Sequence, residues 1–268
     1  MKKVTLLLIV TTLVIFSACT STEENVQPNE VTPEIMAKIE ALGFNTKDFP
    51  VHLHDGNLVV ENDIVFRLDQ LDFMSSRSQF ATEEHYSTDN LVTGLPRTIN
   101  VYVSTSFPQK YFDAVDAANA RYNAENLTLT FQRVGNSNLA DISFTPSPWW
   151  YRFYGILGSA GFPTAAGDPY NEILLTRAYY DNVTDLGALT TTIAHEMGHC
   201  IGFRHTDYMD RSFSCGGATD NEGASDIGAN LIPGTPSSPE VGSWMLACSD
   251  GTNRPFTSGD VTALNYLY

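Results

Sequence analysis

The sequence predicts an α+β fold in which a twisted mixed sheet backs one central helix. Strand and helix patterns alternate over residues 97–176, and a further helical pattern covers residues 186–201. After Gly202 the periodicity ends and glycine and serine become frequent, which indicates an irregular C-terminal subdomain. Because 43% of the 268 residues are hydrophobic, the chain has enough apolar material for one substantial domain and a smaller one.

The larger domain is predicted over residues 91–268. Its strands are expected at residues 97–104, 127–134, 140–144 and 172–176, and its helices at residues 108–124 and 186–201. In the first helix Phe112, Val115, Ala118 and Tyr122 recur at helical spacing. A strand, helix and strand before the second helix imply a mixed sheet behind that helix.

A smaller N-terminal unit is predicted over residues 32–73. Thr32-Pro33 suits the start of a short helix that Gly43 ends, because threonine caps helices and proline is tolerated in the first turn. Asp55-Gly56 lies between two apolar runs, as in a two-residue hairpin turn. This unit is either a removable propeptide or a permanent accessory domain, and both interpretations stay open. Residues 74–90 are polar and rich in residues that break secondary structure, which predicts a linker.

The first 31 residues predict export and a lipid anchor. Lys2 and Lys3 precede an apolar run that ends at Ser17-Ala18-Cys19, the pattern of a lipoprotein signal peptide over residues 1–18. A lipidated Cys19 would hold the protein at the outer membrane or cell surface through a polar tether, residues 19–31. Cleavage at another small residue would instead release the protein. A permanent transmembrane helix is disfavoured, because the apolar run is shorter than the roughly 20 residues that a span requires.

The most specific feature of the sequence is the string His195-Glu-Met-Gly-His-Cys-Ile-Gly-Phe-Arg-His205, of the form H-E-x-x-H-x-x-G-x-x-H. Residues four apart share one face of a helix, so His195 and His199 can bind one metal ion. Gly202 permits the left-handed turn that brings His205 back as a third ligand, and the fourth position stays open for water. Glu196 lies beside that position as a candidate general base.

These residues resemble the extended motif of the metzincin clan of zinc endopeptidases. Ser243-Trp-Met245 is similar to the tight turn that places a methionine beneath the zinc in that clan. Within the clan, the chain most resembles the bacterial dual-action HEIGH metallopeptidase family, also called the M57 type. The segments that carry this likeness are residues 95–101, 195–207, 214–217 and 232–236, and residues 256–268 resemble the helix that closes such domains.

Two residues depart from the family pattern. Met197 stands where the family's nickname has isoleucine, which leaves the ligands untouched. Ala247 stands where some metzincins have a tyrosine that binds zinc, so no such ligand is expected.

The resemblance implies a zinc-dependent endopeptidase with one catalytic Zn²⁺ on His195, His199 and His205. The metal would activate a water molecule, Glu196 would take its proton and return it to the leaving amine, and Met245 would form the floor of the site. The substrate would be a protein or peptide that adds to the edge of the sheet as an extended strand. Asp207 could orient a ligand histidine or hold the loop after the motif.

Two other functions stay open. A surface-anchored binding lipoprotein could hold a structural zinc ion, although such sites usually close the fourth position with a protein ligand, whereas this motif offers a base. A zinc amidohydrolase that acts on cell-wall material would use the same residues on a different bond. Neither the substrate's identity nor the oligomeric state is indicated.

If residues 32–73 form a propeptide, they would restrain the site until the chain is cut, for example near Arg77. A cysteine of this segment that blocks the zinc is excluded, because no cysteine lies between Cys19 and Cys200. A carboxylate could block the zinc instead, but the sequence does not indicate which one.

Three cysteines remain besides Cys19, and an exported protein can form a disulfide. Three pairings are open, as is the state with all three thiols free. Cys200 follows a ligand on the same helix but points about 100° away from it, so it is expected to pack in the core. Cys215 and Cys248 are therefore the predicted pair.

The formal charge of −16 disfavours nucleic acid and anionic lipid as partners. A mature chain without Lys2 and Lys3 has 13 basic and 31 acidic residues, hence −18. This acidity suits cationic peptides or Ca²⁺ in loops, and it serves equally well to keep an exported protein soluble.

Overall fold

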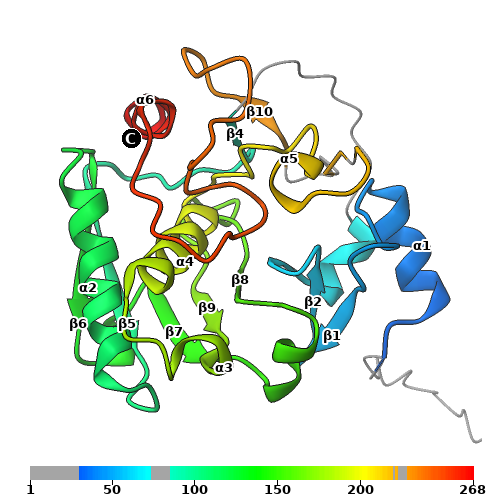
Figure 1. The fold of residues 1–268 in the computed structure, drawn as a ribbon, viewed down its shortest axis with the longest axis horizontal. Helices are drawn as coiled ribbons and strands as arrows, with labels where there is room; N and C mark the ends of the chain where they lie inside the picture. The colour runs from blue at the N-terminus through cyan, green and yellow to red at the C-terminus, as the bar shows by residue number, and fades with distance from the viewer. Residues whose placement is uncertain (1–29, 74–84, 220, 223–227) are drawn as a thin grey trace, which may run out of the picture.

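The computed structural model describes residues 30–73, 85–219, 221–222 and 228–268 (Figure 1). The predicted signal peptide, Cys19, nearly all of the tether and Arg77 lie outside these ranges. None of the helices within them combines the length and the apolarity that crossing a membrane requires.

Within these ranges, eight strands form one mixed sheet in the order β1-β2-β3-β8-β9-β7-β5-β6. β5 pairs in parallel with β6 and β7, and β7 pairs in parallel with β9, whereas β8 is antiparallel to β9. The strands are β1 (His52–His54), β2 (Asn57–Val60), β3 (Ile64–Arg67), β5 (Arg97–Val103), β6 (Leu129–Val134), β7 (Ile142–Pro146), β8 (Gly158–Ala160) and β9 (Glu172–Leu175). A separate pair consists of β4 (Tyr86–Ser87) and β10 (Asn230–Leu231).

The two longest helices, α2 and α4, pack side by side against the sheet (Figure 1). α2 buries one face, and the Oη of its Tyr122 donates to the Ala194 carbonyl of α4 at 2.7 Å. α4 is buried on all sides from Leu189 to Cys200, as expected of a helix at the centre of a domain. The helices are α1 (Pro33–Ala41), α2 (Gln109–Asn123), α3 (Arg177–Tyr180), α4 (Gly187–Cys200), α5 (Ser212–Cys215) and α6 (Ser258–Leu267), with 3₁₀ turns at Leu68–Phe73, Ser137–Leu139 and Trp149–Phe153.

The predicted α+β fold class is confirmed, including the mixed sheet behind the motif helix. Among the smaller elements, α1 begins as expected, because the Thr32 side chain accepts from Ile35 N. The hairpin turn at Asp55-Gly56 also has the expected left-handed backbone, with φ of 48° and 74°. The sequence patterns do not predict β3 or β8, which are four and three residues long.

The predicted linker is wrong for residues 85–88, which are buried. The His85 side chain contacts Asp260 of α6, with Nε2 and Oδ1 2.8 Å apart, and Tyr86 and Ser87 form β4. These residues therefore belong to the C-terminal half of the domain rather than to an exposed connection.

The N-terminal unit extends the same sheet. β3 pairs in parallel with β8 at Ile64 and Ala160, and the Ala160 N–H donates to the Asp63 carbonyl at 2.9 Å. A second hydrophobic core, which includes Ile39, Leu58 and Phe66, holds α1 on β1, β2 and β3. This arrangement brings the turn between β2 and β3 to α4.

Candidate metal centre

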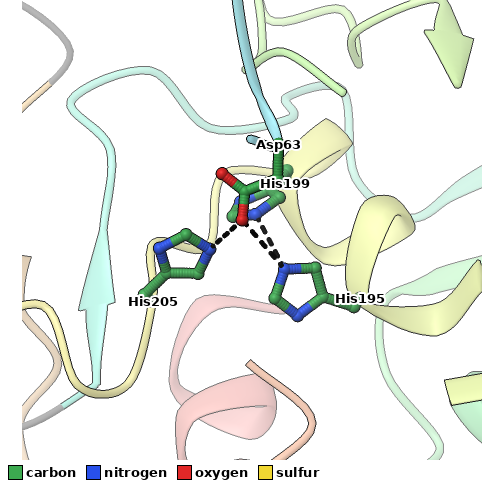
Figure 2. Close-up of side chains that lie close together, drawn as sticks. All are labelled: Asp63, His195, His199 and His205. Atoms are coloured by element: carbon green, nitrogen blue, oxygen red, sulfur yellow. Dashed lines mark hydrogen bonds and ion pairs between the residues drawn. The ribbon is translucent and has the colours of Figure 1, made fainter. Parts of the chain in front are cut away.

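The three histidines of the motif converge on one point, although they come from two segments. His195 and His199 stand one turn apart on α4, with their Nε2 atoms 3.1 Å apart. The helix ends at Cys200, and Gly202, at φ 104°, turns the chain so that His205 faces the other two rings. All three side chains are buried. Figure 2 shows the rings around a common centre.

Hydrogen bonds fix which nitrogen faces the centre. His195 Nδ1 donates to the Trp244 carbonyl at 2.8 Å, and His199 Nδ1 donates to the Phe203 carbonyl at 2.9 Å. A carbonyl oxygen can only accept, so both Nδ1 atoms carry hydrogen. Burial lowers the pKa of His195 to about 4 and the pKa of His199 well below its ordinary value. Both rings are therefore neutral, and their Nε2 lone pairs face each other.

The fourth side chain at the centre is Asp63, from the turn between β2 and β3 (Figure 2). Its Oδ2 lies 2.9 Å from His205 Nε2 and 3.9 Å from His195 Nε2. The other ring nitrogen of His205, Nδ1, lies 2.7 Å from Glu222 Oε2. Burial alone would lower the pKa of His205, but the carboxylates of Glu222 and Asp63 raise it to about 10. His205 is thus held between two acidic groups.

This donor set fits one Zn²⁺. Three imidazole nitrogens and a carboxylate oxygen lie within 4.8 Å of one another. A tetrahedral zinc ion with bonds of about 2.0–2.1 Å separates its ligand atoms by about 3.3 Å, and three of the separations here are 2.9, 3.1 and 3.9 Å. The lone pairs of His195 and His199 repel each other at this distance unless a cation lies between them. The four side chains are therefore arranged for a metal ion.

Glu196 lies beside the same centre, between α4 and β8. Its side chain is buried, and its Oε2 has no hydrogen-bond partner among the residues described. Burial raises the pKa of Glu196 well above its ordinary value, the Asp63 carboxylate raises it further, and His205 acts in the opposite direction. A Cβ at Gly158 of β8 would come within 2.7 Å of Glu196 Oε1, so a larger residue there would displace this carboxyl group.

The turn Ser243-Trp244-Met245 lies against α4 at the predicted place. Met245 is fully buried, and a Cβ at Gly198 would come within 2.5 Å of its Sδ. The same turn supplies the Trp244 carbonyl that holds His195. Asp260 of α6 accepts from Trp244 N and from Ser243 Oγ. The C-terminal helix therefore positions the turn, and the turn positions the first histidine.

A disulfide joins Cys215 of α5 to Cys248, whereas Cys200 is a free, buried thiol. The bridge ties the loop after His205 to the segment after Met245. Closing a loop of this length contributes roughly 3–4 kcal/mol in chain-entropy terms. Asp207 strengthens the same connection, because its carboxylate accepts from Ser214 Oγ and from Ala247 N. Asp207 thus holds the loop, which is one of its two predicted roles.

Sequence reasoning misses two functional side chains, Asp63 and Glu222. Glu222, not Asp207, orients the third histidine, and Arg204 holds Glu222 in turn with Nε 3.1 Å from its Oε1. Neither acidic residue stands at a fixed offset from the motif. The only available signal for Asp63 is the polar turn 61–63 between two apolar runs, and that signal does not reveal what the turn reaches.

A profile of one protein family, described as dual-action HEIGH metallopeptidase, matches residues 58–268. The match begins inside β2 and therefore includes Asp63. Comparison with curated proteins gives no match.

Similar solved structures include two of myroilysin and one of high choriolytic enzyme 1, a hatching enzyme zinc-protease from Oryzias latipes (medaka fish). All three are 15% identical to this chain. The myroilysin structures have TM-scores of 0.43 and cover 66% and 67% of this chain and 82% and 86% of their own. The hatching enzyme has a TM-score of 0.38 and covers 72% of this chain and 98% of its own.

Proposed function

The chain belongs to the dual-action HEIGH metallopeptidase family, and from this premise we propose that it is a zinc endopeptidase with Glu196 as its general base, exported from the cytoplasm. One observation carries the proposal. The Nε2 atoms of three histidines lie at one buried centre, and His195 and Glu196, whose Oε2 has no hydrogen-bond partner among the described residues, line a cavity of about 270 Å³.

The residues of the site divide the work of peptide hydrolysis. His195, His199 and His205 would hold Zn²⁺. When bound, the ion supplies a Lewis acid that makes water nucleophilic near neutral pH and polarises the scissile carbonyl. Glu196 takes the proton of the attacking water and returns it to the leaving amine. Gly158 lets the Glu196 carboxyl group approach β8, the strand beside which an extended substrate would lie.

The test of this function is cleavage of a diverse peptide library, read by mass spectrometry. The full chain is treated with trypsin, the trypsin is inhibited, and the library is added with chelator, without chelator, and with zinc restored after chelation. We expect cleavage that the chelator stops and zinc restores. A protein that keeps zinc but cleaves no peptide under any condition would support the binding lipoprotein. Cleavage confined to cell-wall amides would support the amidohydrolase.

The position of Gly158 yields a prediction about the base. Gly158→Ala places a Cβ against Glu196, and a displacement of about 1 Å at a catalytic group costs about 10²-fold in rate. We expect kcat to fall by about that factor while zinc content is unchanged. Gly135→Ala is the matched control, because a Cβ there meets nothing within 4 Å. Equal kcat values for the two variants would contradict the contact's role.

Latency is the second part of the proposal: residues 32–73 keep the site closed until they are removed. Asp63 lies with the three histidines at the centre, so its carboxylate would take the position that water needs on a bound zinc ion. Two residues earlier, Glu61 forms a buried ion pair with Arg211, which also donates to the Glu61 carbonyl at 3.3 Å. Finally, β3 covers the edge of β8. The segment thus blocks the metal and the sheet edge together.

The backbone of this turn supports a dedicated role. Glu61 and Asn62 have φ of 54° and 72°, a left-handed conformation that side chains other than glycine adopt at a cost of about 1–3 kcal/mol each. The ion pair to Arg211 and the Asn45 N–H bond to Glu61 Oε1 stabilise it. The turn is therefore held in a shape that places Asp63 at the centre.

Export and lipidation complete the proposal. Their support is the signal pattern before Cys19 and the disulfide, which suits an oxidising compartment. We expect Cys19→Ala to move the protein from the membrane fraction to the soluble fraction and to abolish metabolic labelling with palmitate. Palmitate labelling that persists in Cys19→Ala would show that another residue carries the lipid.

A further inference from the structure

The cavity beside the metal centre has two arginines in its wall. It extends from the turn at Asp63, past His195 and Glu196, to the segment after Met245. Arg211 lies in the wall near the turn 61–63, and Arg254 lies against α4 and Cys248. Both side chains are buried, and the Nε of each has no hydrogen-bond partner among the residues described. Two buried guanidinium groups that line one cavity favour an anionic group inside it.

Backbone contacts hold Arg254 in place. Its N–H donates to Thr191 Oγ1 at 2.8 Å, and its carbonyl accepts from Arg121 Nη1 at 2.8 Å. Thr191 is one helical turn before His195 on α4. The position of the arginine relative to the metal centre is therefore set by two helices, α2 and α4.

The guanidinium of Arg254 is only partly satisfied by the protein. Nη1 donates to the Cys248 carbonyl at 3.1 Å, and Nη2 lies 3.2 Å from Asp250 Oδ2. The Asp250 side chain is 54% exposed, and its carboxylate also accepts from the N–H and Oγ1 of Thr252. An exposed, shared carboxylate is a weak partner for a buried cation. Arg254 thus retains the capacity to bind a second carboxylate from the cavity.

At the other end of the cavity, an arginine already binds a carboxylate of this chain. There the buried carboxylate of Glu61 fills the space against Arg211. The chain's own N-terminal segment therefore binds this cavity through an acidic side chain two residues from the one at the metal.

We propose that Arg254 selects peptides with an aspartate or glutamate close to the scissile bond. This inference rests on the proposed function. Arg254 lines the same cavity as His195 and Glu196, so an acidic side chain held by Arg254 belongs to a residue near the scissile bond. The formal charge of −16 opposes acidic peptides only at long range, because salt screens such fields beyond about 8 Å.

The test compares matched peptides that differ only in Glu, Gln or Lys at the selected position. The position is taken from the library cleaved by the trypsin-treated full chain. We expect kcat/KM for Glu to exceed that for Gln by about 10- to 100-fold, the effect of one charge-assisted hydrogen bond. Arg254→Gln should bring this ratio close to one, and Arg254→Glu should favour Lys. Arg133→Gln, which removes an exposed arginine outside the cavity, should leave the ratio unchanged.

A gain-of-preference variant keeps the proposal testable if Arg254 variants unfold. Asp250→Asn removes the competing carboxylate, so the preference for Glu should rise. A library cleaved without enrichment of acidic residues near the cut would overturn the proposal, as would a Glu preference that survives in folded Arg254→Gln. Failure to cleave any peptide would instead contradict the proposed function, which separates the two outcomes.

Discussion

Glu196→Gln is expected to remove nearly all peptide cleavage while the protein keeps its zinc. The amide has nearly the shape of the carboxylate but cannot take a proton from water, and general acid–base catalysis contributes about 10²- to 10⁴-fold. The three histidines are untouched, so their hydrogen bonds to the Trp244 and Phe203 carbonyls and to Glu222 persist. Steady-state kinetics and metal analysis of the purified, trypsin-treated variant provide the measurement.

The matched control for this variant is Glu172→Gln. Glu172 lies on β9 and does not line the cavity at the metal centre. We expect it to retain normal turnover. A fully active Glu196→Gln protein would show that another group acts as the base, and one that loses zinc would show that Glu196 acts through metal binding instead.

Asp63→Ala is expected to make the uncut full chain partly active, because it frees the metal position while β3 still covers the edge of β8. The change removes the Asp63 carboxylate from the centre, which frees the fourth position for water. The Asp63 carboxylate also raises the pKa of Glu196, so its removal lowers that pKa and makes Glu196 available as a base. We expect peptide cleavage before any trypsin treatment to rise at least about tenfold, which corresponds to about 1.4 kcal/mol. Activity of intact protein is measured with mass spectrometry to verify that the chain is uncut.

Two further variants test whether Asp63 itself, rather than the N-terminal segment as a whole, blocks the metal centre. Asp69→Ala removes an exposed carboxylate of the same segment, which pairs with Arg67, and should not activate the chain. The double variant Asp63→Ala, Glu61→Gln also removes the ion pair to Arg211. Its uncut chain should be more active than that of Asp63→Ala alone. If Asp63→Ala instead loses zinc and gains no activity, Asp63 is a permanent structural ligand and residues 32–73 are an accessory domain.

Local patterns predict the parts of the site that are close together in sequence. The helical spacing of His195 and His199, the turn at Gly202 and the return of His205 all follow from backbone geometry within eleven residues. The resemblance of Ser243-Trp-Met245 to a known turn supplies the floor. The disulfide partner of Cys215 follows once Cys200 is assigned to the core.

Contacts between distant segments cannot be predicted in this way. Asp63 reaches the centre only because β3 pairs with β8, and a single residue pair, Ile64 with Ala160, defines that register. Glu222 reaches His205 from a stretch without periodicity, through its pairing with Arg204. Such positions depend on the packing of the whole domain. The composition and residue spacing of one sequence do not reveal which distant segments pack together.

The most direct test of the central claim follows two quantities in one reaction of the zinc-loaded full chain with a small amount of trypsin. Mass spectrometry measures the fraction of chain cut between residues 73 and 85, and a fluorogenic peptide, chosen from the library, measures activity. The zinc content is checked at the end. A latent zinc endopeptidase predicts that activity starts near zero and rises in proportion to the cut fraction. Full activity of the intact chain would contradict latency, and complete cutting with zinc bound but no peptide hydrolysis would contradict the enzymatic assignment itself.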